Sequence, residues 1–553
     1  MTASQPHQGR PASLSGPKRN GPPPAAEAKT LMLQGTASDV GKSVLAAALC
    51  RIFRQDGHRV APFKSQNMSN NSYVTPDGKE IGRAQGMQAD ACGITATTDM
   101  NPILLKPSRE MTAQVVVHGR PYRNLDARTY RESYLPVAES IVREALGRLR
   151  RAYDVVVIEG AGSPAEINLK SRDIVNMRLA EWADAPVLLV ADIDRGGVFA
   201  SVVGTLELLE PHERDRVKGV IINKFRGDVS LLKPGLDWLE TRTGKPVLGV
   251  VPYLPNIGLE DEDSASLDNR RTGASAGCDR PLDIAVLRYP RISNFTDFDA
   301  LAAEPDVRVR FVTAPEEWGR PDAVVLPGSK NTAEDLGYLR QTGLEAKLLA
   351  FAERGGRVAG ICGGYQMMGR RLLDPDGVES ESRAVEGLGM LPLATRFGRE
   401  KRTVRAVGTV VGWPVAAAGT EDATAAGATT EAACAVAGYE IHMGATERVE
   451  PVRPLLILRD ADGTEEEHPE GAISADGRLW GTYLHGIFDS DAFRRLWLNE
   501  LRRDKGLPPA ETGTAYAESR ERAFDRLAGH VRAHLDMEKI YRILQEGKRN
   551  GSF

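Results

Sequence analysis

The sequence predicts an α/β protein built from two doubly wound domains. Short, continuously apolar runs alternate with helical patterns along most of the chain, which is typical of buried strands that helices cover on both faces. The alternation stops at a polar stretch near residue 260 and then begins again. A length of 553 residues also favours more than one hydrophobic core.

The chain divides at changes in composition. We predict a disordered Pro/Gly/Ser-rich tail (1–28), a first domain (29–260), a polar linker (261–280) and a second domain (281–545). Within the second domain, residues 413–437 are low in complexity and are expected to form a surface insertion. The charged, amphipathic sequence from residue 490 onward predicts C-terminal helices that pack on this same domain.

Composition excludes several classes of partner. The net charge is −4, from 71 basic and 75 acidic residues, so nothing favours nucleic acid or an anionic membrane. The five cysteines are scattered without a CxxC pair, which argues against a disulfide framework and a zinc site. No apolar run is long enough for a membrane span or a signal peptide. We therefore expect a cytoplasmic protein, and the sequence leaves open whether it forms homo-oligomers.

The first predicted strand leads into a glycine loop, "GTASDVGKS", from which a helix begins at Lys42. Five residues separate Gly35 from Gly41, where a phosphate-binding loop usually has four. The free N–H groups at a helix start attract phosphate, Lys42 can reach the terminal phosphates, and Ser43 can ligate Mg²⁺. A turn that serves packing alone would not explain Lys and Ser together. We predict an ATP site that includes Thr36, Gly41, Lys42 and Ser43.

Two further strand ends are candidates for the same site. Glu159 ends the apolar run "VVVIE" and could complete a Mg²⁺ shell with Ser43, although a solvated surface carboxylate is the alternative. The loop resembles that of dethiobiotin synthetase-type P-loop proteins, and Asn223 in "IINKF" resembles their adenine-reading Asn. The partition and septum-positioning ATPases place a second lysine where this chain has Thr36.

Polar residues at other strand ends suit contact with a polar substrate. The segment "KSQNMSNN" follows a predicted strand, and an equally acceptable interpretation is a well-capped loop. A second group lies in "VADIDRGG". The candidate substrate residues are Lys64, Gln66, Asn67, Asp192 and Asp194.

The second domain contains a candidate nucleophile, Cys362, in "RVAGICGGYQMMG". A nucleophile on a sharp turn between strand and helix needs glycine neighbours, because the backbone there is strained and closely approached. The helix start also favours a thiolate. A second glycine turn, "LPGSKN", could join the N–H of Gly328 to that of Gly363 in an oxyanion hole. A buried structural cysteine is the alternative.

A thiol nucleophile needs a base, and two histidines compete. His468 and Glu470 match the His-x-Glu motif of glutaminases, but a run of acidic residues precedes them in place of an apolar strand. His485 follows the apolar run "GRLWGTYL", where a sheet could position a base. We predict His485 as the base, His468 as a surface coincidence, and His442 in "GYEIHMG" as a residue that shapes the site.

Taken together, the motifs resemble the cobyric acid synthase family from about residue 30 to 545. The resemblance rests on "QGTASDVGKS", "FKSQNMSNNSYVTPDGKEIGRAQGMQADACG", "NPILLKP", "ADIDRGGVFAS", "LPGSKNT", "GICGGYQMMG", "GYEIHMG" and "WGTYLHGIFD". Neither the tail nor the Ala/Thr-rich insertion belongs to it.

The resemblance implies a two-site amide ligase. Cys362 would release ammonia from glutamine through a thioester, with His485 as base. The first domain would use ATP and Mg²⁺ to phosphorylate the b, d, e and g carboxylates of adenosylcobyrinic a,c-diamide, and ammonia would displace the phosphate. The corrinoid substrate would bring the cobalt, with no metal cluster on the protein. Keeping ammonia from water would require an internal passage.

One position departs from the wider glutaminase pattern. Ile487 stands two residues after His485, where an acidic residue is usual. Asp489 or a backbone carbonyl could orient the ring instead, and the sequence does not distinguish them.

Three other functions compete. The sister enzyme that amidates the a and c groups of cobyrinic acid resembles this chain less at "KSQNMSNN". A ligase acting on a cell-wall precursor would have a Mur-ligase-like ATP domain, and the sequence of the glycine loop argues against such a domain. A regulatory P-loop switch with an inactive glutaminase-like module is opposed by an intact Cys362 and His485.

Overall fold

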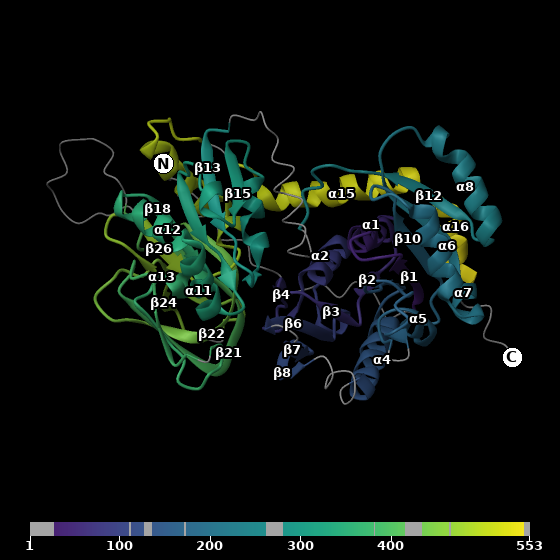
Figure 1. The fold of residues 1–553 in the computed structure, drawn as a ribbon, viewed down its shortest axis with the longest axis horizontal. Coiled ribbons are helices and arrows are strands. Elements are labelled where there is room, and N and C mark those ends of the chain that lie inside the picture. Colours follow the sequence, from purple (N-terminus) through teal and green to yellow (C-terminus); the bar gives the residue numbers. More distant parts are fainter. Residues whose placement is uncertain are drawn as a thin grey trace, which may run out of the picture.

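A computed structural model describes residues 27–109, 112–126, 135–170, 173–260, 280–380, 382–414, 434–463, 466–511 and 513–546. Two α/β bodies lie side by side, the N-terminal one at the right of Figure 1 and the C-terminal one at the left. The predicted tail and linker fall almost wholly outside these ranges, as do residues 415–433 of the predicted insertion. Within the described ranges, no helix has the length and apolar character needed to cross a bilayer.

The first body is organised by a six-stranded sheet in the order β12-β11-β10-β1-β9-β2, and every pairing in it is parallel. Its strands are almost entirely buried, which explains their continuous apolar sequences. The strands are β1 (Lys29–Gly35), β2 (Val60–Phe63), β9 (Val155–Glu159), β10 (Val187–Asp192), β11 (Val217–Phe225) and β12 (Val247–Pro252). The doubly wound prediction is confirmed here.

Helices cover this sheet, and smaller sheets extend it toward the second body. The helices are α1 (Lys42–Gln55), α2 (Arg83–Cys92), α4 (Leu135–Ala152), α5 (Met177–Trp182), α6 (Val198–Leu208), α7 (Pro211–Arg216) and α8 (Val229–Thr243). The added strands are β3 (Gln66–Met68), β4 (Ser72–Val74), β5 (Glu80–Gly82), β6 (Ile103–Arg109), β7 (Thr112–Val117) and β8 (Arg120–Asp126). In Figure 1, β4 lies on the side that faces the second body.

The second body has its own six-stranded sheet in the order β15-β13-β16-β18-β26-β25, parallel except for β25. Its strands are β13 (Leu282–Leu287), β15 (Val307–Val312), β16 (Ala323–Leu326), β18 (Arg357–Ile361), β25 (Ala472–Ile473) and β26 (Leu479–Thr482). Its helices are α10 (Asp299–Ala302), α11 (Thr332–Thr342), α12 (Leu344–Glu353) and α13 (Gly363–Met368). A short pair, β14 (Ile292–Ser293) with β17 (Gly328–Ser329), and the 3₁₀ turns η4 (Phe295–Phe298) and η6 (Ile487–Asp489) border the ends of these strands.

A second sheet in this body contains a long antiparallel hairpin. Its strands are β19 (Arg371–Leu373), β20 (Ala384–Glu386), β21 (Leu393–Val410), β22 (Ala435–Arg448), β23 (Leu456–Asp460) and β24 (His468–Glu470). The predicted bounds of the insertion, 413–437, include residues at both ends that belong to the folded domain. Trp413 packs edge-on against Trp480, and residues 435–437 pair in β22, so both ends belong to the folded domain.

The C-terminal helices divide between the two bodies. As predicted, α14 (Asp491–Asp504) packs on the second one, burying Phe493 and Trp497 in its core. The prediction was wrong for α15 (Tyr516–His534) and α16 (Met537–Glu546), which cover the first body and complete one of its cores. Figure 1 shows α15, in yellow, crossing from one body to the other. Periodicity predicted an apolar helix face but could not tell which sheet it meets.

Candidate active sites

The glycine loop lies between β1 and α1, as predicted. Lys42 is the first residue of α1, and its Nζ donates to the carbonyl oxygens of Ala37, at 3.0 Å, and Gly162, at 3.1 Å. Gly41 adopts a φ of +97°, and a Cβ there would lie 2.3 Å from Nδ2 of Asn223. That amide donates to the carbonyl of Val40 at 2.8 Å. The loop therefore needs glycine at position 41 and is joined directly to Asn223.

The two residues predicted to hold Mg²⁺ meet at this loop. The hydroxyl of Ser43 donates to Oε1 of Glu159 at 2.8 Å, and Nζ of Lys64 contacts the same oxygen at 2.9 Å. Glu159 is buried, and its Oε2 accepts from Gln88 at 2.6 Å. A hydroxyl beside a carboxylate at the end of a P-loop is a donor set that suits Mg²⁺.

The predicted substrate residues separate into two groups. Asp192 and Asp194 lie at the carboxyl end of β10, where Asp192 is in register with Asn223 and pairs with Lys224 at 2.9 Å. Asp194 pairs with Arg226 at 3.0 Å.

On the other side, Lys64 pairs with Glu159 at 2.9 Å, Gln66 begins β3, and Asn67 is buried with its amide donating to Gln85 at 3.0 Å. The side chain of Asn67 is thus engaged inside the first body.

Cys362 stands on the strained turn that the glycines predicted. It joins β18 to α13 with a φ of +51°, a conformation unusual for any residue but glycine. Its Sγ lies 3.7 Å from the carbonyl oxygen of Ile441 in β22. A Cβ on Gly363 would meet the backbone nitrogen of Ser329 at 2.8 Å, so the two glycine turns touch. A Cβ on Gly328 would lie 3.3 Å from Cε1 of His485.

His485 follows β26 and is fully buried. Its Nδ1 lies 2.7 Å from Oδ2 of Asp297, in η4. Burial lowers the pKa of His485, but the negative charges of Asp297 and Cys362 outweigh burial and raise it to about 10. The carboxylate that contacts His485 therefore lies 188 residues earlier in the chain. Asp489, one of the two groups that the sequence offered for orienting the ring, is exposed. A sequence signal was present, since Asp297 stands in "NFTDF", a carboxylate among residues expected to be buried.

The other two histidines have different surroundings. The ring of His442 stacks on Tyr483 with centroids 3.6 Å apart, and its Nδ1 donates to the carbonyl of Gly444 at 3.1 Å. Burial lowers the pKa of His442 to about 3, so it stays neutral beside the site. His468 lies in β24 of the other sheet.

The cysteine site adjoins the first body. Val74 of β4 packs with Tyr439 and Ile441 of β22, and Ile441 is the residue whose carbonyl faces Cys362. Arg83 donates to the hydroxyl of Tyr439 at 2.9 Å. The strand that forms one wall of the cysteine site is therefore also part of the interface between the bodies.

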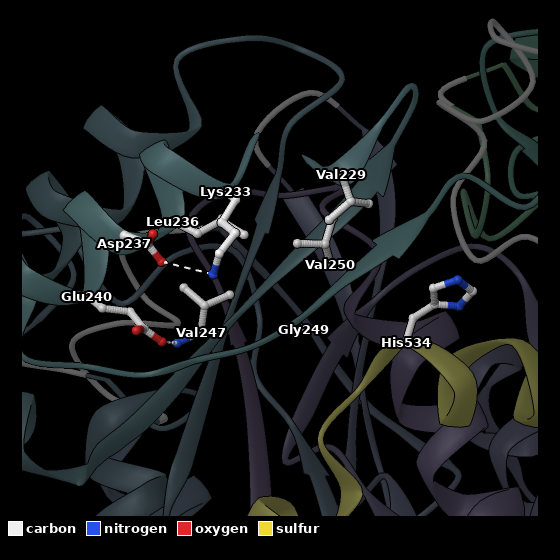
Figure 2. Close-up of a pocket in the computed structure, with 9 residues that line it drawn as sticks. All are labelled: Val229, Lys233, Leu236, Asp237, Glu240, Val247, Gly249, Val250 and His534. Carbon is white, nitrogen blue, oxygen red and sulfur yellow. Dashed lines mark hydrogen bonds and ion pairs between the residues drawn. The ribbon is translucent and has the colours of Figure 1, made fainter. Parts of the chain in front are cut away.

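Figure 2 shows the residues around a separate surface cavity, where α8 and β12 approach the end of α15. The volume of this cavity is about 410 Å³. None of the predicted site residues lines it. Its lining consists of Val229, Lys233, Leu236, Asp237, Glu240, Val247, Gly249, Val250 and His534.

The fold and the two sites define a glutamine amidotransferase joined to a P-loop nucleotide-binding domain. Comparisons with known families agree: a model described as a CobB/CobQ-like glutamine amidotransferase domain matches residues 283–493, and one described as a CobQ/CobB/MinD/ParA nucleotide binding domain matches residues 31–266.

Curated relatives match over nearly the whole chain. The cobyric acid synthase of Desulforamulus reducens is 52% identical over 95% of this chain and 100% of that protein. The cobyric acid synthase of Geobacillus kaustophilus is 52% identical over 94% of this chain and 98% of that protein. The cobyric acid synthase of a Dehalococcoides mccartyi strain is 51% identical over 95% of this chain and 100% of that protein. The chain belongs to the cobyric acid synthase family.

Proposed function

We propose that this protein makes adenosylcobyric acid in cobalamin biosynthesis. It uses ATP and glutamine to amidate the b, d, e and g carboxylates of adenosylcobyrinic acid a,c-diamide. Support comes from family membership over nearly the full length, together with the intact nucleotide loop and cysteine site. The sister a,c-diamide synthase is not favoured, because the full-length relatives are named cobyric acid synthases.

In the second body, Cys362 is the proposed nucleophile and His485 its base. The thiol proton passes to His485, the sulfur bonds to the side-chain carbonyl carbon of glutamine, and the carbon–nitrogen bond breaks. The imidazolium returns its proton to the departing ammonia, and water then hydrolyses the thioester to glutamate. The N–H groups of Gly328 and Gly363 are proposed to stabilise the oxyanion, which their proximity to the two catalytic residues supports.

In the first body, the proposed chemistry is activation of a carboxylate. Ammonia does not displace oxide from a carboxylate, whereas an acyl phosphate has phosphate as its leaving group. Lys42 would bind the terminal phosphates, Thr36 and Gly41 would line the loop, and Asn223 would read the base. Ser43 and Glu159 would hold Mg²⁺, which when bound offsets the negative charge of the phosphates. Lys64, Gln66, Asn67, Asp192 and Asp194 remain proposed substrate residues.

The observation that carries the coupled reaction is the contact between β22 and β4. The carbonyl of Ile441 contacts Cys362, and the side chain of Ile441 packs against Val74 of the first body. Ammonia released at Cys362 would therefore form beside the body that activates the carboxylate.

The direct test is mass spectrometry of adenosylcobyrinic a,c-diamide incubated with the protein, ATP, Mg²⁺ and glutamine. Four successive amide additions are expected. Hydrolysis of glutamine without any change in the corrinoid would mean that the protein amidates another acid.

A further inference from the structure

We propose that Asp297 is the third member of the glutaminase site and positions His485 for proton transfer with Cys362. This inference deepens the proposed function and rests on it. Sequence pattern offers no acid at the usual place, since the residue there, Ile487, is buried in the hydrophobic core.

The geometry is that of an orienting carboxylate. Oδ2 of Asp297 lies 2.7 Å from Nδ1 of His485, and Oδ1 accepts from the backbone N–H of Gly486 at 3.1 Å. The two side chains are 2% and 0% exposed, so water does not compete for the contact. The contact with the Asp297 carboxylate requires a proton on Nδ1, and it leaves Nε2 as the nitrogen that exchanges a proton with Cys362.

Two side chains also hold the plane of the ring. Nδ2 of Asn294 lies 3.1 Å from Nε2 and 3.5 Å from Nδ1 of His485. An atom in line with the lone pair of one ring nitrogen would lie much farther from the other, so the amide lies over the face of the ring. The ring of Tyr439 is also stacked on His485, with centroids 5.1 Å apart. Neither contact lies in the plane of the ring at Nε2, so that position stays available for proton exchange with the thiol.

Among the carboxylates in the described ranges, Asp297 is the one paired with His485. Glu470, the acid of the His-x-Glu pattern, accepts instead from the hydroxyl of Thr482 at 2.5 Å and the backbone of Tyr483 at 2.7 Å. It therefore anchors the strand that leads to His485 rather than the ring itself.

The role follows from the reaction. When His485 takes the proton of Cys362, the ring becomes positive, and a buried positive charge is stable only beside a fixed negative one. The proton moves from sulfur to Nε2 and then to ammonia, while Asp297 keeps its contact with Nδ1. Asp297 is thus a positioning residue that acts through His485.

The first test is Asp297→Asn, which keeps shape but removes the charge and allows the wrong tautomer. We expect the kcat of glutamine hydrolysis to fall by about 10²-fold or more, with KM changed little and ammonia-driven amidation retained. The pH at which Cys362 is alkylated at half its maximal rate should rise by about one unit or more, because the imidazolium no longer supports the thiolate. Asp476→Asn is the matched control, because this exposed carboxylate accepts from the backbone N–H of Arg478 at 3.1 Å in the turn before β26; it should leave both measurements unchanged. A kcat within about threefold of wild type in Asp297→Asn would overturn the proposal.

A second measurement does not depend on a folded variant. In wild-type protein, ¹⁵N-histidine NMR should show a proton on Nδ1 of His485 far downfield of the amide region, assigned by its loss in His485→Gln. Absence of that proton contradicts the proposal. If wild-type protein fails to hydrolyse glutamine at all, the proposed function fails, while the alkylation profile and the NMR signal still test Asp297.

Discussion

The backbone N–H of Ser72 in the first body donates a 2.9 Å hydrogen bond to Oδ1 of Asn294 in the second. The hydroxyl of Tyr439 donates to the carbonyl of the same Ser72 at 3.4 Å. Both Asn294 and Tyr439 contact the ring of His485. One residue of the nucleotide-binding body therefore touches both side chains that lie against the face of the His485 ring.

Replacing Asn294 with Ala should loosen the ring of His485. Because one hydrogen bond contributes about 1 kcal/mol net, we expect kcat for glutamine hydrolysis to fall about fivefold, with ammonia-driven amidation unaffected. Steady-state glutaminase kinetics measure the effect. Asn499→Ala, remote in α14 and bonded to Ala510, is the control that should keep wild-type kcat. An Asn294→Ala enzyme with unchanged kcat would show that the contact does not position the ring.

Cys362→Ala should abolish glutamine-driven amidation but keep ammonia-driven amidation. The thioester cannot form without the thiol, whereas the phosphate loop is untouched; a loss of about 10³-fold or more is expected. Lys42→Ala should lose both activities, because neither nitrogen source bypasses carboxylate activation. Amide formation is followed by mass spectrometry with each nitrogen source, and Cys434→Ala, another buried free cysteine, serves as control. Retention of ammonia-driven synthesis by Lys42→Ala would mean that the loop is not the activation site.

Glu159→Gln should raise the Mg²⁺ concentration needed for amidation by about tenfold. The substitution removes the charge that faces Ser43 but keeps the shape of the side chain. Initial rates across a Mg²⁺ titration measure the shift, and glutamine hydrolysis in the same preparation reports on the second body. If the Mg²⁺ curve coincides with that of wild type, Glu159 does not bind the metal.

Glu80→Gln should weaken the interface between the bodies. Glu80 is buried and pairs with Lys401 of the second body at 2.7 Å and with Lys106 of its own at 3.3 Å. Burial raises the pKa of Glu80, but the two lysines outweigh burial and hold it at about 2. Removing the carboxylate leaves the lysines without their counter-charge, at a cost of about 3–5 kcal/mol.

The pH dependence of that loss has a definite sign. Because the folded pKa of Glu80 lies below the ordinary value of 4.5, its stabilisation is present above pH 4.5 and disappears as pH falls toward 2. Urea unfolding of wild type and Glu80→Gln should therefore differ at pH 7 and converge in acid. Glu450→Gln, in an exposed pair with Arg370, is the control and should change stability far less. An equal difference between wild type and Glu80→Gln at pH 7 and pH 3 would contradict the assignment.

Short sequence motifs predicted those parts of the fold and of the sites whose conformation depends on neighbouring residues in the chain. The glycine loop needs Gly41 where φ is positive, and Cys362 needs glycine neighbours on its turn, so both appear in the sequence as spaced motifs. Asp297 has no such spacing, because it meets His485 only after the two ends of the second body fold together. Periodicity likewise predicted that α15 has an apolar face, but it could not predict that this face packs on the first body.

The two C-terminal helices set an order for biosynthesis. More than 260 residues separate the end of β12 from the start of α15, yet Phe524, Leu527 and Val531 of α15 fill the same core as Leu31 and Leu33 of β1. A ribosome therefore releases the nucleotide-binding sheet and α1 long before α15 and α16, so the core that these elements share stays incomplete until translation is almost finished. An incomplete chain leaves the apolar residues of this core without their last partners, so the first body reaches its full stability only after the second body has been made.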